Sequence, residues 1–517
     1  MARAPSLTQS MSGVHTWVGL LLGWALFAIF LTGTLAVFDK EIDWWMAPEL
    51  TNQDQGPVVA ANVAQRWLQA NHPTSSSWNI ALPTERSPRL AVSVDGQRRG
   101  ENTPLDAETG EPLAVRDTLG GAFFFHFHYT LHLPRLLGVW VVGFAAMAML
   151  VALVSGIIIH KKIFKDFFTF RPAKGQRSWL DGHNASAVLL LPFHLMITYT
   201  GLAIFCVLYM PAAVDALYGG DRQALFREAD PAAAAQTGRG FGRDAPKSQA
   251  PAAPLLALGQ FVEQGEAYYG RGMVAAVSVS DPGHADARVT VRPVLGNRIE
   301  LTKGQGLTYD GVSGALLHEP APARASLLTQ RVLAGLHFAQ FGGYPMRWLY
   351  FLCGLVSCAM IGSGLVLYAV KKRKQARDDR FLAVVERLNV SVIAGLTVAC
   401  LALLWSNRLL PATLEARASA ELAAFFGVWL ATLLHAMWRP PLQAWREQLL
   451  VAAVLALALP LLDFLSADTT DRVRLSIDTA AAVMGLVFGW TAWKVPALLA
   501  NGRSEPLLRV RPAGAAQ

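Results

Sequence analysis

Charged residues are scarce in this chain. Only 16% of its 517 residues are Asp, Glu, Lys or Arg, whereas 53% are hydrophobic and the mean hydropathy is +0.33. Ordinary soluble domains carry roughly 25% charged residues, so this balance excludes an ordinary soluble enzyme. The scarcity of charge therefore indicates an integral membrane protein.

Cysteine and the common catalytic motifs are missing or sparse as well. The chain has four cysteines, all inside apolar runs, and this placement favours buried free thiols over a disulfide framework or a metal cluster. We find no P-loop, no His-Glu-x-x-His and no Gly-x-Ser-x-Gly pattern. A glycine triplet at 238–243 lies in a Pro/Ala/Gly-rich stretch and is typical of a linker outside the membrane. The net charge of +8 comes from Lys and Arg at the edges of apolar runs, so we expect no nucleic-acid partner.

Long apolar runs are what the sequence has in abundance. Each is about 20 residues or more in length, which is enough to cross roughly 30 Å of hydrocarbon. The first run continues into Phe38-Asp39-Lys40 without a cleavage pattern, so we interpret it as a retained anchor. We therefore expect a mainly α membrane protein with eight transmembrane helices, near 15–38, 136–159, 185–209, 347–370, 385–404, 420–437, 447–465 and 476–496.

Lys and Arg in the short loops predict the orientation. The two densest basic clusters lie at 161–180 and just after residue 370, and such clusters favour the cytoplasmic side. Counting crossings then places both termini inside, and residues of about 40–130 and 211–335 outside.

An internal repeat organises the chain from its start to about residue 370. His15 precedes Gly33 by the same number of positions as His183 precedes Gly201. Each of these helices is followed by a segment that we interpret as a helix and then strands. The two segments close with "LDAETGEPL" (105–113) and "YDGVSGALL" (309–317), which are typical of hairpins with Gly at positive φ.

Each half then continues into a second helix. His132 follows Gly110 at almost the same spacing at which His337 follows Gly314, and the two counts differ by a single position. Both of these helices end in a Ser-Gly pair. The order helix, small α+β domain, helix thus occurs twice, and it predicts these units: first repeat 1–160, basic loop 161–180, second repeat 181–372, four-helix extension 381–500 and cytoplasmic tail 501–517.

The repeat brings four histidines to two levels. Because both halves start on the same side, they are parallel repeats, and paired residues reach equal depth. His15 then faces His183 on the cytoplasmic side, and His132 faces His337 on the outer side. Facing imidazoles in a helical bundle can ligate both axial positions of a haem iron, so the pattern predicts two haems.

Other histidines leave alternatives open. A single histidine near a helix end is more often an interfacial residue than a ligand. His160 abuts two lysines, and we interpret it as interfacial. His194 has no symmetry mate and is a second-choice ligand, a relay or a propionate contact. His126 and His128 either line a substrate or haem edge or belong to a hydrated interfacial belt.

The sequence resembles a known family. The stretches "HTWVGLLLGWALFAIFLTG", "WLDGHNASAVLLLPFHLMITYTG", "LHLPRLLG" and "LHFAQFGG", with the Asp-x-x-[Thr/Ser]-Gly hairpins, are similar to the PepSY-associated transmembrane helix family of bacterial inner-membrane proteins over about 8–375. The resemblance implies periplasmic PepSY-like domains and, as in some members, reduction of ferric siderophores through b-type haems. The histidines that match are His15, His132, His183 and His337, with His194 and His160 as second choices. The extension beyond residue 380 departs from short members.

These observations together predict a function. We expect haem-mediated electron transfer across the inner membrane, from a cytoplasmic reductase or quinol to a periplasmic acceptor such as a ferric siderophore. Reduction would release the iron, because hard oxygen ligands suit Fe(III) better than Fe(II). One alternative is a non-catalytic membrane module that binds a periplasmic protein or peptide. Another is a small-molecule transporter, which should show polar or broken helices in the middle of the membrane.

Overall fold

The computed structural model describes residues 6–50, 55–95, 102–160, 176–229, 248–296, 298–302, 305–373, 379–467 and 471–500. Three stretches singled out above fall wholly or mostly outside these ranges: the basic loop at 161–180, of which only 176–180 is described, the glycine triplet at 238–243, and the tail at 501–517.

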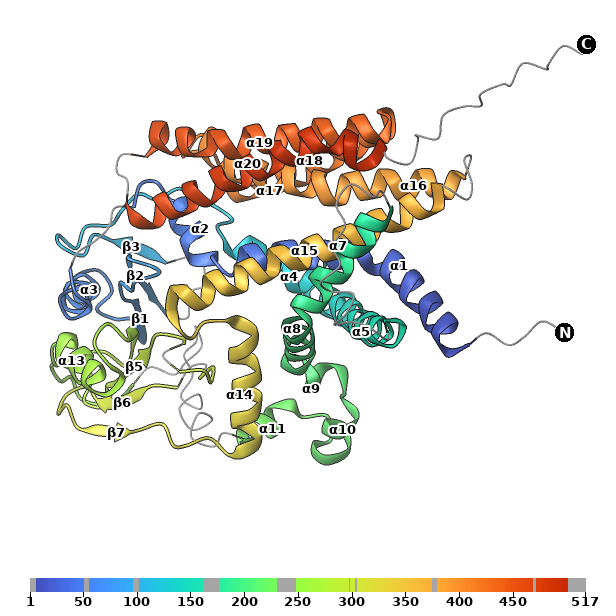
Figure 1. Cartoon of the computed structure of the whole chain (residues 1–517). Helices are drawn as coiled ribbons and strands as arrows, with labels where there is room; N and C mark the ends of the chain where they lie inside the picture. The colour runs from blue at the N-terminus through green and yellow to red at the C-terminus, as the bar shows by residue number, and fades with distance from the viewer. Residues whose placement is uncertain are drawn as a thin grey trace, which may run out of the picture.

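Long apolar helices dominate the described chain (Figure 1). Seven stretches are long and apolar enough to cross a membrane, and a broken pair supplies an eighth if it is counted as one span. The eight predicted runs are thus confirmed as helices, and the third is the broken one. The seven are α1 (Leu7–Ala36), α5 (Arg135–Ile159), α15 (Gly343–Arg373), α16 to α17 (Arg380–Leu409), α18 (Arg417–Trp438), α19 (Pro441–Ser466) and α20 (Arg472–Ala500).

The broken pair consists of α7 (Gln176–Leu189) and α8 (Leu191–Ile204), which meet at an angle of 66°. Pro192 lies in the first turn of α8. Proline has no backbone N–H and its ring clashes with the carbonyl four residues earlier, so the chain starts a new helix there. The remaining helical segments are α2 (Asp39–Trp45), α3 (Pro57–Asn71), α4 (Ala122–Thr130), α9 (Cys206–Tyr209), α10 (Ala212–Tyr218), α11 (Arg222–Ala229), α13 (Leu258–Tyr269), α14 (Ala325–Phe338), α16 (Arg380–Asn389), the π-helix η1 (Val390–Gly395) and α17 (Leu396–Leu409).

Four helical spans form the centre of the molecule. Helix α1 packs against α5 and α15, α8 packs against α5, and α7 packs against α15. Two shorter helices pack against this bundle at its sheet end. Helix α4 contacts α1, and α14 contacts α8. Figure 1 shows the bundle between the sheet on one side and the free N-terminal end of α1 on the other.

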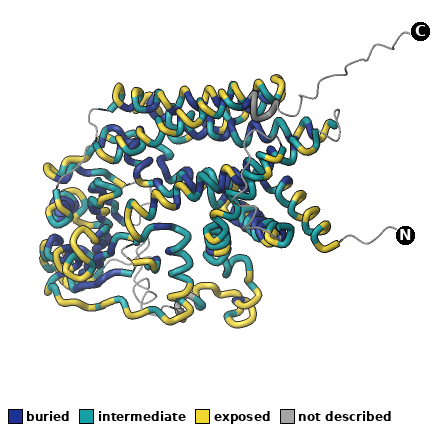
Figure 2. Tube along the Cα trace, viewed as in Figure 1, coloured by how far each residue is buried: buried dark blue, intermediate teal, exposed yellow. Residues whose placement is uncertain are grey.

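The C-terminal extension lies along one side of this bundle (Figure 1). An apolar core joins α17, α18 and α19 to α1, α2 and α4; Phe425 contacts Phe123 and Phe127 there, with ring centres 4.8 and 5.7 Å apart. Figure 2 shows that the outer faces of these helices are exposed, and the large exposed side chains on them include Leu430, Val454 and Trp490, which are apolar. Large exposed apolar surfaces of this kind fit contact with lipid.

The segments between the paired spans form one sheet. Its seven antiparallel strands run in the order β3-β2-β1-β4-β5-β6-β7, with β1 (Ser77–Ala81), β2 (Leu90–Val94), β3 (Thr103–Leu105), β4 (Val274–Ser280), β5 (Arg288–Pro293), β6 (Leu307–Asp310) and β7 (Leu316–His318). Strands β1 to β3 come from the first repeat and β4 to β7 from the second. The two α+β segments, expected as separate domains, therefore share one sheet through the β1–β4 pair.

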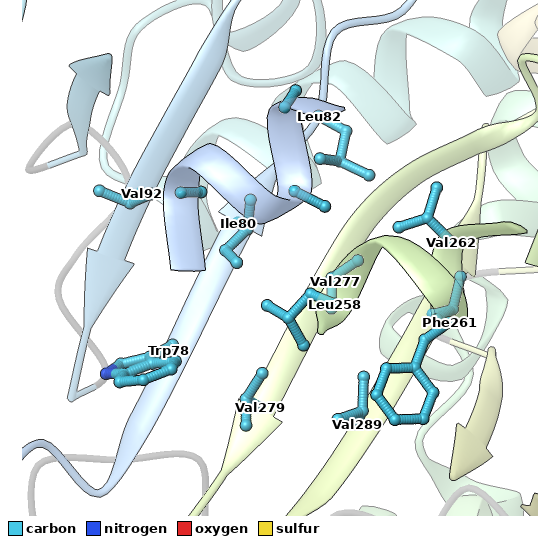
Figure 3. Packing of buried hydrophobic residues seen from close by; sticks show 14 of the residues in the cluster. Trp78, Ile80, Leu82, Val92, Leu258, Phe261, Val262, Val277, Val279 and Val289 are labelled. Atoms are coloured by element: carbon cyan, nitrogen blue, oxygen red, sulfur yellow. The ribbon is translucent and has the colours of Figure 1, made fainter. Parts of the chain in front are cut away.

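One face of the sheet is covered by helices α3 and α13. The inward side chains are apolar, among them Trp78 and Ile80 of β1 and Val277 of β4, and they belong to one buried cluster with Phe261 of α13 (Figure 3). The alternation of apolar and polar residues along each strand places the apolar set on this face. Helices α3 and α13 also contact each other, where Gly259 N donates to Asn62 Oδ1 over 2.8 Å.

The two predicted hairpins are confirmed. Asp106 Oδ1 accepts from the backbone N–H of Thr109 over 2.8 Å, and Asp310 Oδ1 accepts from that of Ser313 over 2.7 Å. Each turn closes with a glycine at positive φ, Gly110 at 80° and Gly314 at 77°. The two repeats therefore use the same turn chemistry.

Candidate functional site

Two histidines face each other at the end of the bundle that is farther from the sheet. His15 lies on α1 and His183 on α7, and their ring centres are 6.1 Å apart at an interplanar angle of 70°. The equal spacing of these histidines to matching glycines predicted this encounter. We call these two residues the sheet-distal pair.

A second pair lies at the sheet end of the bundle. His128 on α4 and His337 on α14 have ring centres 6.0 Å apart and planes inclined by 34°. We call them the sheet-proximal pair. Helix α1 carries both His15 and Gly33, which contacts His128, so the two pairs lie roughly 27 Å apart at about 1.5 Å per residue.

The predicted partner of His337 was His132, and this prediction is wrong. His132 lies beyond the end of α4 at a positive φ of 57°, after Leu131 at 51°. That turn directs its ring to Phe123 and to Phe426 of the extension, with ring centres 5.9 and 5.7 Å away. His132 therefore belongs to an aromatic contact with α18, and His128 takes its place in the pair.

All four paired histidines are held in the same way. Each ring places Nδ1 against a backbone carbonyl of a neighbouring helix: His15 on Ala152 at 2.9 Å, His183 on Met360 at 2.8 Å, His128 on Ile29 at 2.8 Å and His337 on Ile197 at 3.0 Å. Donation from Nδ1 to a carbonyl selects the tautomer whose Nε2 carries a lone pair, and metal-binding histidines are oriented in this manner.

Each of these carbonyls lies four residues before a glycine on which the histidine ring rests. A Cβ atom on Gly33 would lie 2.5 Å from His128 Nδ1, and one on Gly201 would lie 2.9 Å from His337 Cε1. A side chain at either position would push the ring away, so glycine is required there. The corresponding glycines for the other two rings are Gly156 for His15 and Gly364 for His183.

A Ser or Thr precedes every one of the four glycines. Its hydroxyl donates to a carbonyl in the preceding turn of its own helix, and the members are Thr32, Ser155, Thr200 and Ser363. At two of these four positions the hydroxyl also contacts the histidine ring. Ser155 Oγ is 3.3 Å from His15 Nδ1, and Thr200 Oγ1 is 3.1 Å from His337 Nδ1. Each helical span of the central bundle therefore supplies a carbonyl, a hydroxyl and a glycine to one histidine. We call each such set of three groups a seat.

The spacing within each pair fits a haem iron. Two imidazoles that bind one metal ion through Nε2 at about 2 Å each have ring centres roughly 6 Å apart. The observed separations are 6.1 and 6.0 Å. Among the described residues, no group of three or more His, Cys, Asp or Glu side chains could hold a metal ion.

The two second-choice histidines belong to neither pair. His194 on α8 is fully buried, and its Nε2 contacts Ser357 Oγ of α15 over 2.9 Å. Its Nδ1 has no hydrogen-bond partner among the residues that the structure describes. His160 ends α5, four residues after the seat at Gly156.

A sequence signal for His128 does exist. His128-Tyr129 and His337-Phe338 are matching His-aromatic pairs near the ends of α4 and α14. Counting from the hairpin glycines obscures this match, because His128 follows Gly110 sooner than His337 follows Gly314. The difference arises from helix length, because α4 has nine residues whereas α14 has 14 and carries its histidine further from its first residue.

The fold and the four seats define a multi-pass membrane protein built from a duplicated helix, α+β segment, helix unit, with a histidine pair at each level of the bundle. The chain belongs to the family of the PepSY-associated TM region, whose model matches residues 12–371. The match covers both repeats and ends before the extension.

A curated relative is an uncharacterized protein of Pseudomonas aeruginosa. It is similar to this chain at 26% identity over 313 residues, which covers 57% of the chain and 72% of the relative.

Proposed function

We propose that this protein carries electrons across the bacterial inner membrane through two b-type haems, and that it delivers them to a periplasmic acceptor such as a ferric siderophore. His15 and His183 would hold one haem, and His128 and His337 the other. The single observation that supports this proposal best is the fourfold recurrence of one seat, in which Nδ1 meets a carbonyl and Nε2 is left to bind a metal.

A bound haem would supply one-electron chemistry, and the chain's own residues would set its position and environment. The carbonyls of Ile29, Ala152, Ile197 and Met360 fix the imidazole tautomers. Hydrogen bonds at Nδ1 also raise the basicity of the ligand nitrogen, which favours the oxidised metal and lowers its reduction potential. The apolar helix packing of the central bundle keeps water away.

The charge distribution supports a direction for the electrons. Lys371, Lys372 and Arg373 lie in the last turn of α15, at the sheet-distal end of the bundle. Basic residues favour the cytoplasmic side, so the sheet and the sheet-proximal pair would lie in the periplasm. A cytoplasmic reductase or quinol would then act as donor, and the acceptor would bind near the sheet.

Haem counting tests the proposal. We expect purified wild-type protein to show a Soret band that shifts on addition of dithionite, with two haems per chain by pyridine haemochrome. His128→Ala and His15→Ala should each lose about one haem equivalent, because one axial ligand of one site is gone. His132→Ala is the matched control and should keep both.

Either of two results would contradict the proposal. A colourless wild-type protein, after expression with adequate haem supply, rules out the haems themselves. Loss of one haem in His132→Ala with both retained in His128→Ala would rule out the ligand set.

Transport of a small molecule remains a second candidate because of one observation. The break between α7 and α8 lies inside the membrane-spanning region, close in sequence to buried His194, and broken helices are typical of substrate sites in transporters. Electron transfer predicts that His194→Leu keeps two haems and the reductase rate. A transporter predicts a colourless protein in which the same substitution abolishes uptake into proteoliposomes.

A further inference from the structure

His132, which belongs to neither histidine pair, lies on an apolar surface. Its side chain is exposed, and the chain that follows it into α5 exposes Leu133, Leu136 and Leu137 at 39%, 62% and 54%. Exposed leucines at the start of a candidate membrane span fit contact with lipid. A polar imidazole in such a place costs free energy and indicates a functional site.

The contact between His132 and Phe426 indicates the depth of the imidazole. Phe426 is nine residues after Arg417, the first residue of α18, which corresponds to about 14 Å along the helix axis. Because the ring centres of His132 and Phe426 are 5.7 Å apart, the imidazole lies beside the membrane-spanning part of α18 and not beyond its sheet-side end. The exposed surface around His132 therefore faces lipid.

The backbone holds the imidazole there in an unfavourable conformation. Leu131 and His132 have φ of 51° and 57°, and among the described residues no other two neighbouring non-glycine residues both have positive φ. A Cβ atom disfavours this conformation. Leu131 N donates to Phe127 O over 2.7 Å and His132 N donates to Thr130 Oγ1 over 3.1 Å, and these bonds fix the turn. Strained backbone of this kind clusters at functional sites.

Aromatic rings flank the imidazole. Phe123 of α4 and Phe426 of α18 have ring centres 5.9 and 5.7 Å from that of His132, and Trp429 stacks on Phe426 at 6.4 Å. Within the part of the chain that the structure describes, neither ring nitrogen of His132 forms a hydrogen bond. Flat apolar rings beside a free donor and acceptor suit a flat, lipid-soluble ligand that carries a hydrogen-bonding oxygen. A quinol head group has this chemistry.

The chain itself keeps His132 close to the sheet-proximal pair. His132 follows His128 by four residues, and four residues of fully extended chain span at most about 14 Å. The turn at Leu131 and His132 makes the actual path shorter than this limit. A ligand at His132 would therefore lie near a residue that is proposed to hold a haem. Of the two donor classes considered for the proposed electron transfer, quinol is the one that diffuses within lipid.

We propose that His132, Phe123 and Phe426, which we call the His132 site, bind the head group of a quinol, and that His132 accepts its first proton. The inference rests on the proposed electron transfer, for which it names the donor. Oxidation of one quinol to the quinone releases two electrons and two protons. One electron would pass to each of the two proposed haems, whose ferric iron would be reduced to ferrous iron. His132 would take one proton, and the second would pass to water at the sheet side of the membrane.

Quinol-driven haem reduction in full-length, haem-loaded protein in nanodiscs tests the His132 site. Decylubiquinol is the probe, and the Soret band reports reduction. We expect His132→Asn to slow this reduction at least tenfold, because asparagine tolerates positive φ but does not take up the proton. Phe426→Ala should slow it at least threefold. Dithionite should still reduce both haems in each variant.

His126→Asn is the matched control, since His126 is also an exposed histidine of α4, but its Nδ1 contacts Tyr129 OH over 2.9 Å. We expect this variant to keep both haems and to be reduced by decylubiquinol within twofold of the wild-type rate. Equal rates of quinol-driven reduction in wild type and His132→Asn would overturn the His132 site.

Photolabelling with an azidoquinone gives a readout that does not depend on electron transfer. We expect labelled peptides within 121–137 and 417–438 of the wild-type protein, and excess decylubiquinone should compete the label away. Labelling only outside these two stretches would overturn the His132 site. Labelling there that decylubiquinone does not displace would indicate nonspecific contact from the lipid phase and would overturn it as well. Wild-type protein without a dithionite-sensitive Soret band would instead contradict the proposed electron transfer, and the labelling would still decide the binding.

Discussion

The two repeats build the same pair of histidine seats from helices of different construction. In the first repeat α1 runs unbroken over 30 residues, whereas its counterpart in the second repeat is divided into α7 and α8 at 66°. Helix α4 of the first repeat is buried under Phe425 of the extension, whereas Gly335 is the buried residue of the corresponding α14. The seats thus tolerate variation in the helices that carry them.

The C-terminal extension accounts for the burial of α4. It covers the first repeat with an apolar core and adds buried polar contacts. Arg417 donates to Asp117 O over 2.9 Å and pairs with Glu421, which accepts from Thr118 and from Leu119 N. Trp45 Nε1 of α2 donates to Asp478 of α20 over 2.9 Å. The extension is therefore joined to the first repeat on its sheet side.

Loss of the buried Arg417–Glu421 ion pair should have the largest effect on stability. Arg417 and Glu421 are both fully buried, so Arg417→Ala leaves an unpaired buried carboxylate. We expect a loss of about 3–5 kcal/mol in the free energy of unfolding, measured by denaturant titration in detergent. Arg298→Ala is the control: Arg298 pairs with Glu300 but its side chain is 67% exposed, so the change should stay within about 0.5 kcal/mol. Equal effects of the two substitutions would show that the extension is not anchored here.

Substitution of the seat glycines should have an intermediate effect, and the effect should differ between the seats at Gly33 and Gly156. An added Cβ would lie 2.5 Å from the His128 ring at Gly33 but 3.4 Å from the His15 ring at Gly156. We expect Gly33→Ala to displace His128, at a cost of about 1–3 kcal/mol, and to lower the haem content by one equivalent. Gly156→Ala should keep both haems. If both variants retain two haems, the close contact at Gly33 is not required.

The hairpins should show the smallest effect, and it should be equal in the two repeats. The backbone N–H of Thr109 lowers the pKa of Asp106, and that of Ser313 lowers the pKa of Asp310. A folded-state pKa below the unfolded value of about 3.9 gives stability that is present above that pH and is lost as the pH falls through the folded pKa. Both side chains are largely hydrated, so we expect well under ~1 kcal/mol each.

Hydrogen exchange of the intact protein measures this effect. Peptides covering 105–113 and 309–317 should lose protection, relative to the intrinsic exchange rate at each pH, below about pH 4, and Asp106→Asn and Asp310→Asn should each remove this pH dependence in their own hairpin alone. A pH response in one hairpin but not in the other would show that the two turns are not equivalent.

The sequence predicted features that depend on local spacing. The stretches from His15 to Gly33 and from His183 to Gly201 are equally long, and this equality is visible in the sequence although the second stretch crosses the 66° break between α7 and α8. The Asp-x-x-[Thr/Ser]-Gly turns are likewise local. His128 was missed because α4 is shorter than α14, so fewer helical residues precede His128 than precede His337, and a count from the hairpin glycines does not reveal a difference in helix length. The β1–β4 pairing was missed because it joins strands from two distant segments.

The β1–β4 pair has a further consequence for biogenesis. Strand β1 ends at Ala81, but its partner β4 begins only at Val274, so one edge of β1 has no hydrogen-bonded neighbour until β4 of the second repeat has been synthesised. At synthesis rates of about 5–20 residues per second, the intervening stretch 82–273 takes roughly 10–40 s. During that interval the nascent chain exposes a strand edge that could pair with other chains. Protection of that edge during synthesis would then limit the yield of assembled protein.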